Sequence, residues 1–254
     1  MLKSTNLKRR DTYLNKLIGF QDTEPVKVIT GIRRCGKSSL LKLMISHLIE
    51  TGIQEDQILE MNFESFDFRK MSSEEVYNYV QTHKAVGKKM YLFFDELQRI
   101  PSWEDAINAF RVDLDCDIYI TGSNAKLLSG ELTTVLGGRY VEFTIYPFSF
   151  AEFKELYSSV FPDVSDTAAF QKYLILGGMP YLGNLRYMEE PAKQYLKDIY
   201  NSVVLTDVVR RNKIRDIDLL GRIVAYVIGN VGTTFSANSI VEFLKSEHRA
   251  VAAD

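Results

Sequence analysis

Short hydrophobic runs alternate with helical patterns along the chain up to about Pro147. The runs are bounded by turn residues and are rich in Val, Ile, Phe and Tyr, which is typical of strands. The run that ends at Asp95 is apolar at nearly every position, as in a central parallel strand that is buried on both faces. Strands are expected at residues 26–30, 58–63, 89–95, 117–121 and 140–146. This alternation predicts an α/β domain with helices on both faces of its sheet.

Helices between the strands are indicated by apolar stripes and capping patterns. The stretch 38–50 carries its Leu, Met and Ile residues at helical spacing. Ser72 and Glu75 form a capping-box pattern that opens a helix. Ser102 and Asp105 have the same spacing and are expected to begin another helix.

Beyond Pro147 the strand pattern stops and helical patterns follow one another. They cover residues 149–157, 166–176, 189–211, 217–228 and 235–245. The glycines and proline of residues 177–180 indicate a turn. We therefore expect three parts: an α/β domain at residues 1–150, a helical domain at residues 151–228, and the start of a further domain at residues 229–254.

Composition and charge are those of an ordinary globular protein. The 254 residues are 46% hydrophobic and 25% charged, with a net charge of −2, so no overall positive field attracts the chain to nucleic acid. Two cysteines are too few for a disulfide framework, which favours a reducing cytoplasm. No apolar stretch follows the basic N-terminus, so no secretory signal is expected. The longest apolar runs are only a few residues, so no membrane span is expected either.

The segment GIRRCGKS at residues 31–38 carries the strongest chemical signal. It matches the pattern G-x-x-x-x-G-K-S/T between an apolar strand and a helix, which is the setting of a phosphate-binding loop. Its glycines let backbone N–H groups turn towards an anion, and the helix N-terminus adds positive potential. Lys37 is expected to reach the β- and γ-phosphates of a nucleotide, and Ser38 to ligate Mg²⁺. The alternative is a glycine-rich turn with a surface lysine.

The remaining residues of this loop are unusual. Arg33 and Arg34 bring two cations close to the expected phosphates, and at least one is expected to pair with a nearby acid. These cations are also expected to lower the pKa of Cys35, so that its oxidation would block nucleotide binding. The candidate nucleotide-binding residues are Gly31, Arg33, Arg34, Cys35, Gly36, Lys37, Ser38 and Ser39.

Two acidic residues stand at the end of the third expected strand. Ligands of open parallel sheets bind at the carboxyl ends of the strands, so Asp95 is a candidate Mg²⁺ ligand. Glu96 is placed to act as a catalytic base on an attacking water. The alternative is that both residues only cap the following helix.

Two further polar segments are candidates. Asn124 follows the fourth expected strand and could position the attacking water, with Ser123 as a substitute, or it could cap the next helix. The first role requires the fourth strand to lie between the first and the third. Arg139 precedes the fifth strand on a glycine-rich loop. It is either a catalytic arginine, for its own or a neighbour's γ-phosphate, or a plain surface residue.

Four segments together resemble one family: GIRRCGKSS, YLFFDELQRIPSW, YITGSNAKLLSGEL and GGRYVEFTIYPFSFAEF. The family is that of prokaryotic AAA-type P-loop ATPases with a C-terminal domain of unknown function, and the resemblance spans about residues 10–245. It implies a parallel sheet of order 5-1-4-3-2, and ATP with Mg²⁺ as the ligand. Carried over by motif, Lys37 binds the nucleotide, Ser38 and Asp95 are the metal ligands, and Glu96 is the catalytic acid. Asn124 or Ser123 falls in the sensor position, and Arg139 is a candidate arginine finger that the motif alone does not assign.

The resemblance also concerns the C-terminal part. Family members look as though they continue into a winged-helix segment, and residues 233–245 are similar to its first helices. The part at residues 229–254 is therefore expected to be the start of a truncated, winged-helix-like domain.

Three functions are compared. The first is Mg²⁺-dependent ATP hydrolysis coupled to a conformational change on an unknown partner. The second is a slow nucleotide-gated switch that binds DNA or protein through the C-terminal region, motivated by the basic run at residues 208–215. A solvated helix end explains the same run. The third, a small-molecule kinase, is disfavoured because the first 150 residues contain no arginine-rich lid. A homo-oligomer is expected by analogy only.

Overall fold

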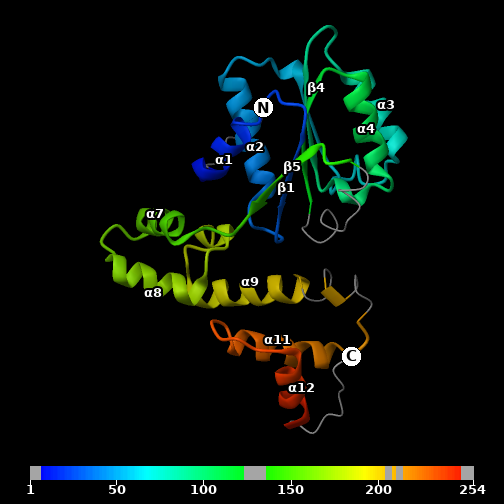
Figure 1. The fold of residues 1–254 in the computed structure, drawn as a ribbon. Coiled ribbons are helices and arrows are strands. Elements are labelled where there is room, and N and C mark those ends of the chain that lie inside the picture. The colour runs from blue at the N-terminus through cyan, green and yellow to red at the C-terminus, as the bar shows by residue number, and fades with distance from the viewer. Residues whose placement is uncertain (1–6, 123–135, 204–207, 210–213, 247–254) are drawn as a thin grey trace. The chain divides into compact units, whose positions relative to one another are not determined.

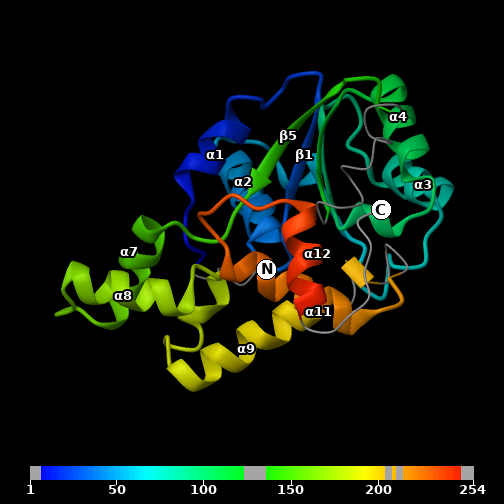
Figure 2. The same ribbon diagram turned by 60° about the horizontal axis from the view of Figure 1, so that its bottom comes forward.

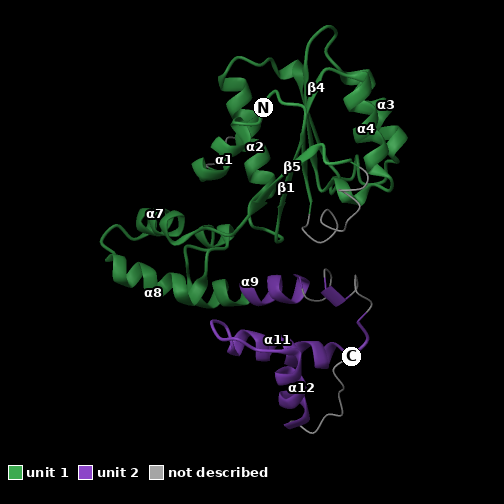
Figure 3. Ribbon diagram, viewed as in Figure 1, with its two compact units in different colours: residues 1–195 green, residues 196–254 purple. Residues whose placement is uncertain are grey.

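A computed structural model describes residues 7–122, 136–203, 208–209 and 214–246. The chain divides into two compact units, residues 1–195 and residues 196–254, which Figure 3 distinguishes by colour. The limits expected at residues 150 and 228 rest on sequence pattern and stay a prediction.

Five parallel strands form the sheet described in the first unit (Figure 1). They are β1 (Val26–Gly31), β2 (Ile58–Asn62), β3 (Met90–Asp95), β4 (Cys116–Thr121) and β5 (Tyr140–Ile145). Their order is β2-β3-β4-β1-β5, and each neighbouring pair is parallel. The predicted α/β class and the order 5-1-4-3-2 are therefore confirmed. Because β4 lies between β1 and β3, the residues that end these three strands meet at one edge of the sheet.

Helices cover both faces of this sheet (Figures 1 and 2). They are α1 (Asp11–Ile18) and α2 (Lys37–Glu50) on one face, and α3 (Ser73–His83) and α4 (Trp103–Asp113) on the other. Successive side chains of a strand point to opposite faces, and β3 uses both. Tyr91 and Phe93 pack in the core beside α1 and α2, while Leu92 and Phe94 pack in the core beside α3 and α4. Burial on both faces fixes β3 at the centre of the domain.

The two predicted capping patterns had different outcomes. Ser72 accepts a hydrogen bond from the Glu75 backbone N–H, and the Glu75 carboxylate accepts one from the Ser72 N–H, as a capping box requires. Ser102 precedes α4 but has a φ of +51° and makes no side-chain capping bond. The helix expected to begin at Ser102 is confirmed as α4, although the Ser102 hydroxyl does not cap it, since an N-cap residue needs extended backbone to aim its hydroxyl at the first turn.

After β5 the chain leaves the sheet and becomes helical, as predicted. The elements are α7 (Phe150–Val160), α8 (Asp166–Leu176), the 3-10 helix η3 (Pro180–Gly183) and α9 (Glu189–Ser202). A hydrogen bond joins the segment between β5 and α7 to the turn after α8. In this bond the Phe148 N–H donates to the Gly178 carbonyl at 2.7 Å. A Cβ on Gly178 would lie 2.0 Å from the Phe148 carbonyl oxygen, so only glycine fits there. The rest of the helix expected to residue 211 includes segments outside the described residues.

The second unit contains α11 (Ile217–Gly229) and α12 (Ala237–Ser246). Tyr226 packs against Phe243 and Phe235, with ring-centroid distances of 4.8 and 6.0 Å. This aromatic cluster joins the two helices. In the described part of the chain, no helix is both long enough and apolar enough to cross a membrane. The winged-helix interpretation of this region stays a prediction.

Candidate functional site

The loop between β1 and α2 turns sharply at two glycines. Gly31 has a φ of +148°, and a Cβ there would lie 2.3 Å from the Ile145 carbonyl oxygen of β5. Gly36 ends the loop with a φ of +107°, a conformation that suits glycine because it lacks a Cβ. Arg34 adopts the left-handed conformation as well, with a φ of +65°. The loop thus has the tight backbone geometry that a phosphate-binding nest requires.

Lys37 is the first residue of α2, and its side chain folds back across the loop. Its Nζ donates to the carbonyl oxygens of Gly31 and Ile32 at 3.1 and 3.2 Å. The same ammonium lies 3.9 Å from the Glu96 carboxylate. Only 5% of Lys37 is exposed, so this cation is held in place by its surroundings. The structure therefore brings Lys37 and Glu96 together from opposite sides of β4.

Asp95 ends β3 and is 3% exposed. Its Oδ1 accepts hydrogen bonds from Ser38 Oγ at 3.0 Å and from Thr121 Oγ1 at 2.5 Å. Its Oδ2 accepts one from Asn62 Nδ2 at 3.1 Å. The carboxylate is therefore fixed by donors from α2, β4 and β2. Asn62 and Thr121 were not predicted from the sequence, although both end strands that neighbour β3.

Glu96 follows β3 in the left-handed conformation, with a φ of +57°. Its backbone N–H donates to Thr121 Oγ1 at 3.0 Å, and its carboxylate accepts a hydrogen bond from the Gln98 amide. Left-handed backbone is unfavourable for a residue with a side chain and is found preferentially at functional sites. In this conformation the Glu96 carboxylate lies 3.9 Å from the ammonium of Lys37.

The donors around Ser38 and Asp95 suit a magnesium ion. A hydroxyl and a carboxylate are hard oxygen ligands, which Mg²⁺ prefers in proteins together with phosphate oxygens and water. Ser38 Oγ and Asp95 Oδ1 are 3.0 Å apart at the start of α2, where the phosphates of a nucleotide would lie. The residues present therefore fit the metal that the sequence predicted.

The two arginines of the loop, Arg33 and Arg34, differ in exposure to solvent. Arg34 is exposed, and its guanidinium carbon lies 5.6 Å from the centroid of the Tyr195 ring, within the range of a cation–π contact. Arg33 and Ser39 are half-buried. Arg34 thus links the loop to an aromatic residue of α9.

Cys35 does not have the reactivity that the sequence suggested. Its side chain is fully buried in the core beside α1 and α2. Burial raises the pKa of its thiol, and this outweighs the opposite effect of Lys37 and Arg10. The expected lowering of its pKa is therefore wrong, because desolvation dominates over the neighbouring cations. Cys35 contributes its backbone and its packing to the loop.

Of the two other predicted catalytic residues, the structure describes Arg139 alone. Asn124, with Ser123, lies outside the described residues. Arg139 is exposed, and its carbonyl accepts a hydrogen bond from the Val26 N–H at 3.0 Å, at the amino end of β1. The loop begins at the carboxyl end of the same strand, about 16 Å away at 3.3 Å per residue. Arg139 therefore lies far from the loop of its own chain.

Sequence comparison identifies the family of this chain. A family model described as an AAA domain matches residues 23–154, more than half of the chain. The chain belongs to this family of P-loop ATPases. A second model, described as a domain of unknown function (DUF8612), matches residues 167–253.

Relatives are found in bacteria and archaea. An uncharacterized protein of Haemophilus influenzae is 38% identical over 241 residues, which cover 94% of this chain and 60% of the relative. The uncharacterized protein MJ1544 of Methanocaldococcus jannaschii is 29% identical over 241 residues, covering 90% of this chain and 52% of the relative. The chain therefore spans between half and two thirds of the length of these relatives.

A solved structure has the same fold. The Walker-type ATPase PABY2304 of Pyrococcus abyssi superposes with a TM-score of 0.62 at 18% identity, covering 98% of this chain and 87% of that one. At this identity the similarity concerns the fold alone.

Proposed function

We propose that this protein binds Mg·ATP and hydrolyses its β–γ phosphoanhydride bond. The observation that carries this proposal is the convergence of Lys37, Ser38, Asp95 and Glu96 at one edge of the sheet. A hydrogen bond of 3.0 Å joins Ser38 to Asp95, and 3.9 Å separates Lys37 from Glu96. A cation, a hydroxyl and two carboxylates beside a phosphate-binding loop are the groups that nucleotide hydrolysis requires.

Each residue has one role in the proposed reaction. Backbone N–H groups of the loop and Lys37 bind the β- and γ-phosphates. Ser38 and Asp95 hold the metal ion, which neutralises charge on the phosphate oxygens when it is bound. Glu96 takes a proton from water as the water oxygen bonds to the γ-phosphorus, and the bond to the bridging oxygen breaks. The products are ADP and inorganic phosphate.

Two residues are proposed to complete the site. Asn124 follows β4, which lies between β1 and β3, and in this role its amide orients the attacking water. Arg139 is proposed to act on the γ-phosphate of a neighbouring copy, because it lies at the opposite end of β1 from its own loop. The site is then complete only in a homo-oligomer, and turnover depends on assembly.

We also propose how ATP hydrolysis is coupled to a conformational change and to a partner. Hydrolysis is proposed to drive a conformational change of the helical region at residues 151–228, acting on a partner in the cytoplasm. The alternative is a slow switch that binds DNA or protein through the C-terminal region, where residues 208–215 carry four basic side chains. DNA binding of this kind weakens steeply with added salt, so a salt titration separates it from partner-independent turnover.

The test is a calorimetric titration with Mg·ATP of the wild-type protein, of Lys37→Ala and of Lys42→Ala. Lys42 is an exposed lysine on the same helix and serves as the matched control. Lys37→Ala is expected to weaken binding about 10–100-fold, since a hydrogen bond to a charged group contributes about 1.5–3 kcal/mol. Lys42→Ala is expected to bind normally. Equal affinities of all three proteins would overturn the proposed site.

A further inference from the structure

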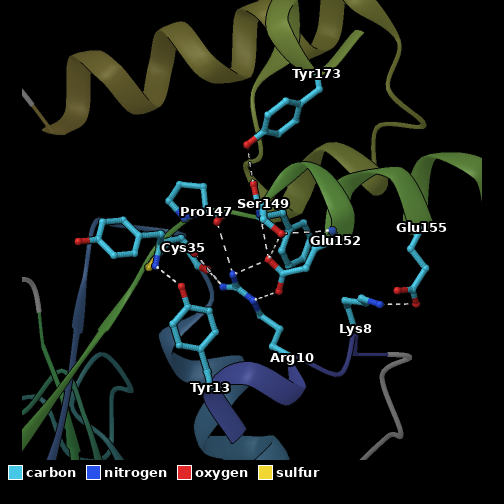
Figure 4. A network of polar contacts seen from close by, with 11 residues as sticks. Lys8, Arg10, Tyr13, Cys35, Pro147, Ser149, Glu152, Glu155 and Tyr173 are labelled. Atoms are coloured by element: carbon cyan, nitrogen blue, oxygen red, sulfur yellow. Dashed lines mark hydrogen bonds and ion pairs between the residues drawn. The ribbon is translucent and has the colours of Figure 1, made fainter. Parts of the chain in front are cut away.

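Arg10 is a buried cation outside the loop and outside the part of the chain that the AAA domain model matches. It precedes α1, and 5% of it is exposed. A buried guanidinium is costly unless its donors find partners. Figure 4 shows that its side chain lies between the phosphate loop, the segment that follows β5, and the start of α7.

The guanidinium of Arg10 uses every N–H donor that it has. Nε and Nη2 donate to the two oxygens of the Glu152 carboxylate at 2.6 and 3.0 Å. Nη1 donates to the carbonyl oxygens of Tyr146 at 2.8 Å and Cys35 at 3.4 Å, and Nη2 also donates to that of Pro147 at 3.4 Å. An arginine has five such donors in a rigid fork, so its position is fixed from three directions.

Aromatic rings and a helix cap hold this arrangement. The rings of Tyr13 and Phe148 lie 4.5 and 5.0 Å from the guanidinium carbon. The Glu152 carboxylate also accepts hydrogen bonds from the backbone and hydroxyl of Ser149, which cap α7. Burial opposes ionisation of Glu152, but the bonds from Arg10 and Ser149 outweigh it and lower the pKa of its carboxyl. Glu152 therefore stays charged and keeps Arg10 in place.

The bond to Cys35 has a consequence for the phosphate loop. In a planar trans peptide the carbonyl of one residue and the N–H of the next point in opposite directions. Nη1 of Arg10 binds the Cys35 carbonyl oxygen at 3.4 Å, so this oxygen faces the buried pair of Arg10 and Glu152. The N–H of Gly36, in the same peptide unit, is then directed to the opposite side, where the phosphates of a nucleotide would lie.

We propose that Arg10 is a positioning residue of the nucleotide site, which fixes the Cys35–Gly36 peptide so that its N–H is oriented for phosphate. The inference rests on the proposed function. It gives an assignment to a residue that lies before the loop motif and contacts the loop through the Cys35 carbonyl. Its contribution is preorganisation: without Arg10 the loop must order itself when the nucleotide binds, which weakens affinity.

The test measures binding of two probes, Mg·ATP and Mg²⁺ with inorganic triphosphate, at a temperature where every variant is folded. The variants are Arg10→Ala and Arg10→Lys. Arg9→Ala is the matched control, because Arg9 is exposed and its ion pair among the described residues is local, with Asp11 at 2.7 Å. Triphosphate reports on the loop without a contribution from the base.

Arg10→Ala is expected to weaken both probes about tenfold, which corresponds to about 1.4 kcal/mol, with Arg9→Ala unchanged. Arg10→Lys keeps the charge but not the fork, and is expected to weaken both probes at least about threefold. If Arg10→Ala does not fold, the affinities of Arg10→Lys test the positioning role of Arg10. A purely structural role would lower the melting temperature and leave both affinities unchanged.

Three results are contrary to the proposal. Unchanged affinity of a folded Arg10 variant for both probes would overturn the inference alone. Weaker binding of Mg·ATP with unchanged binding of triphosphate would also overturn it, since Arg10 would then act on the base. Failure of the wild-type protein to bind either probe would overturn the proposed function, and this inference with it.

Discussion

Ser38 and Asp95 are 57 positions apart in the chain, and a hydrogen bond of 3.0 Å joins their side chains. Ser38 lies in the first turn of the helix after β1, and Asp95 ends β3. The sheet order brings them together, because β4 alone separates β1 from β3 and all three strands end at the same edge. This pair of side chains marks where a nucleotide and its metal would bind.

Thr121 links the two acidic residues of the site. Its hydroxyl donates to Asp95 and accepts from the Glu96 N–H. Thr121→Val keeps the shape but removes both bonds, and is expected to lower kcat about tenfold, since a buried hydrogen bond contributes about 1 kcal/mol or more. The measurement is steady-state hydrolysis at saturating Mg·ATP. Thr82→Val, on the exposed side of α3, should be unaffected, and a wild-type rate for Thr121→Val would contradict this role.

Gly31 tolerates no side chain. A Cβ would meet the Ile145 carbonyl oxygen at 2.3 Å and Cys35 Sγ at 2.8 Å. Gly31→Ala is expected to destabilise the protein by about 2–3 kcal/mol, as overpacking does, and to weaken nucleotide binding. Gly19→Ala is the control, because a Cβ there has only ordinary contacts at 3.5 Å. Chemical denaturation of both variants gives the comparison, and equal stabilities would contradict the close approach of β1 and β5.

Glu152 predicts a dependence of stability on pH. Its pKa is lower in the folded protein than its usual value of 4.5. Between these two values the unfolded chain binds more protons, so the stabilisation is complete above pH 4.5 and is lost as the pH falls through the folded pKa. The free energy of unfolding of Glu152→Gln should therefore fall below that of wild type above pH 4.5 and approach it in acid.

The control for this experiment is Glu155→Gln on the same helix. Glu155 pairs with Lys8 but is 69% exposed, and exposed ion pairs contribute little. Glu155→Gln should therefore change the free energy of unfolding only slightly at every pH. A constant difference between wild type and Glu152→Gln from pH 3 to pH 7 would show that the Arg10–Glu152 pair does not titrate as described.

Much of the fold could be predicted from the sequence, because local patterns determine it. The apolar runs became β1 to β5, and the stripe of residues 38–50 became α2. Local patterns did not predict the features that depend on contacts between residues far apart in the chain. Arg10 and Glu152 are 142 positions apart, and nothing near Arg10 in the sequence identifies its partner. Cys35 has cations as its sequence neighbours, but its burial in the core controls its pKa.

The site could be predicted in outline for the same reason. Lys37, Ser38 and Asp95 belong to motifs with fixed spacing, so their meeting follows from the sheet order. Asn62 and Thr121 carry no motif, and they reach Asp95 only because β2 and β4 flank β3. Knowing the sheet order, one could have found them as the polar residues that end neighbouring strands.

Arg139 leads to a prediction about assembly. It lies at the amino end of the sheet, away from the loop of its own chain. Turnover per protomer is expected to rise with protein concentration, and Arg139→Ala should abolish that rise while leaving nucleotide affinity within about twofold. Arg69→Ala, another exposed arginine of the same unit, is the control. Turnover that is independent of concentration and unaffected by Arg139→Ala would remove Arg139 from the mechanism.

Glu96 provides the most direct test of the central claim, which is that this site hydrolyses ATP. The measurement is phosphate release from saturating Mg·ATP by wild type, by Glu96→Gln and by Glu50→Gln, an exposed glutamate at the end of α2. Loss of a general base lowers the rate about 10²–10⁴-fold. We predict a loss of this size for Glu96→Gln, with Mg·ATP still bound, and a wild-type rate for Glu50→Gln. Equal rates of phosphate release by wild type and Glu96→Gln would contradict the account.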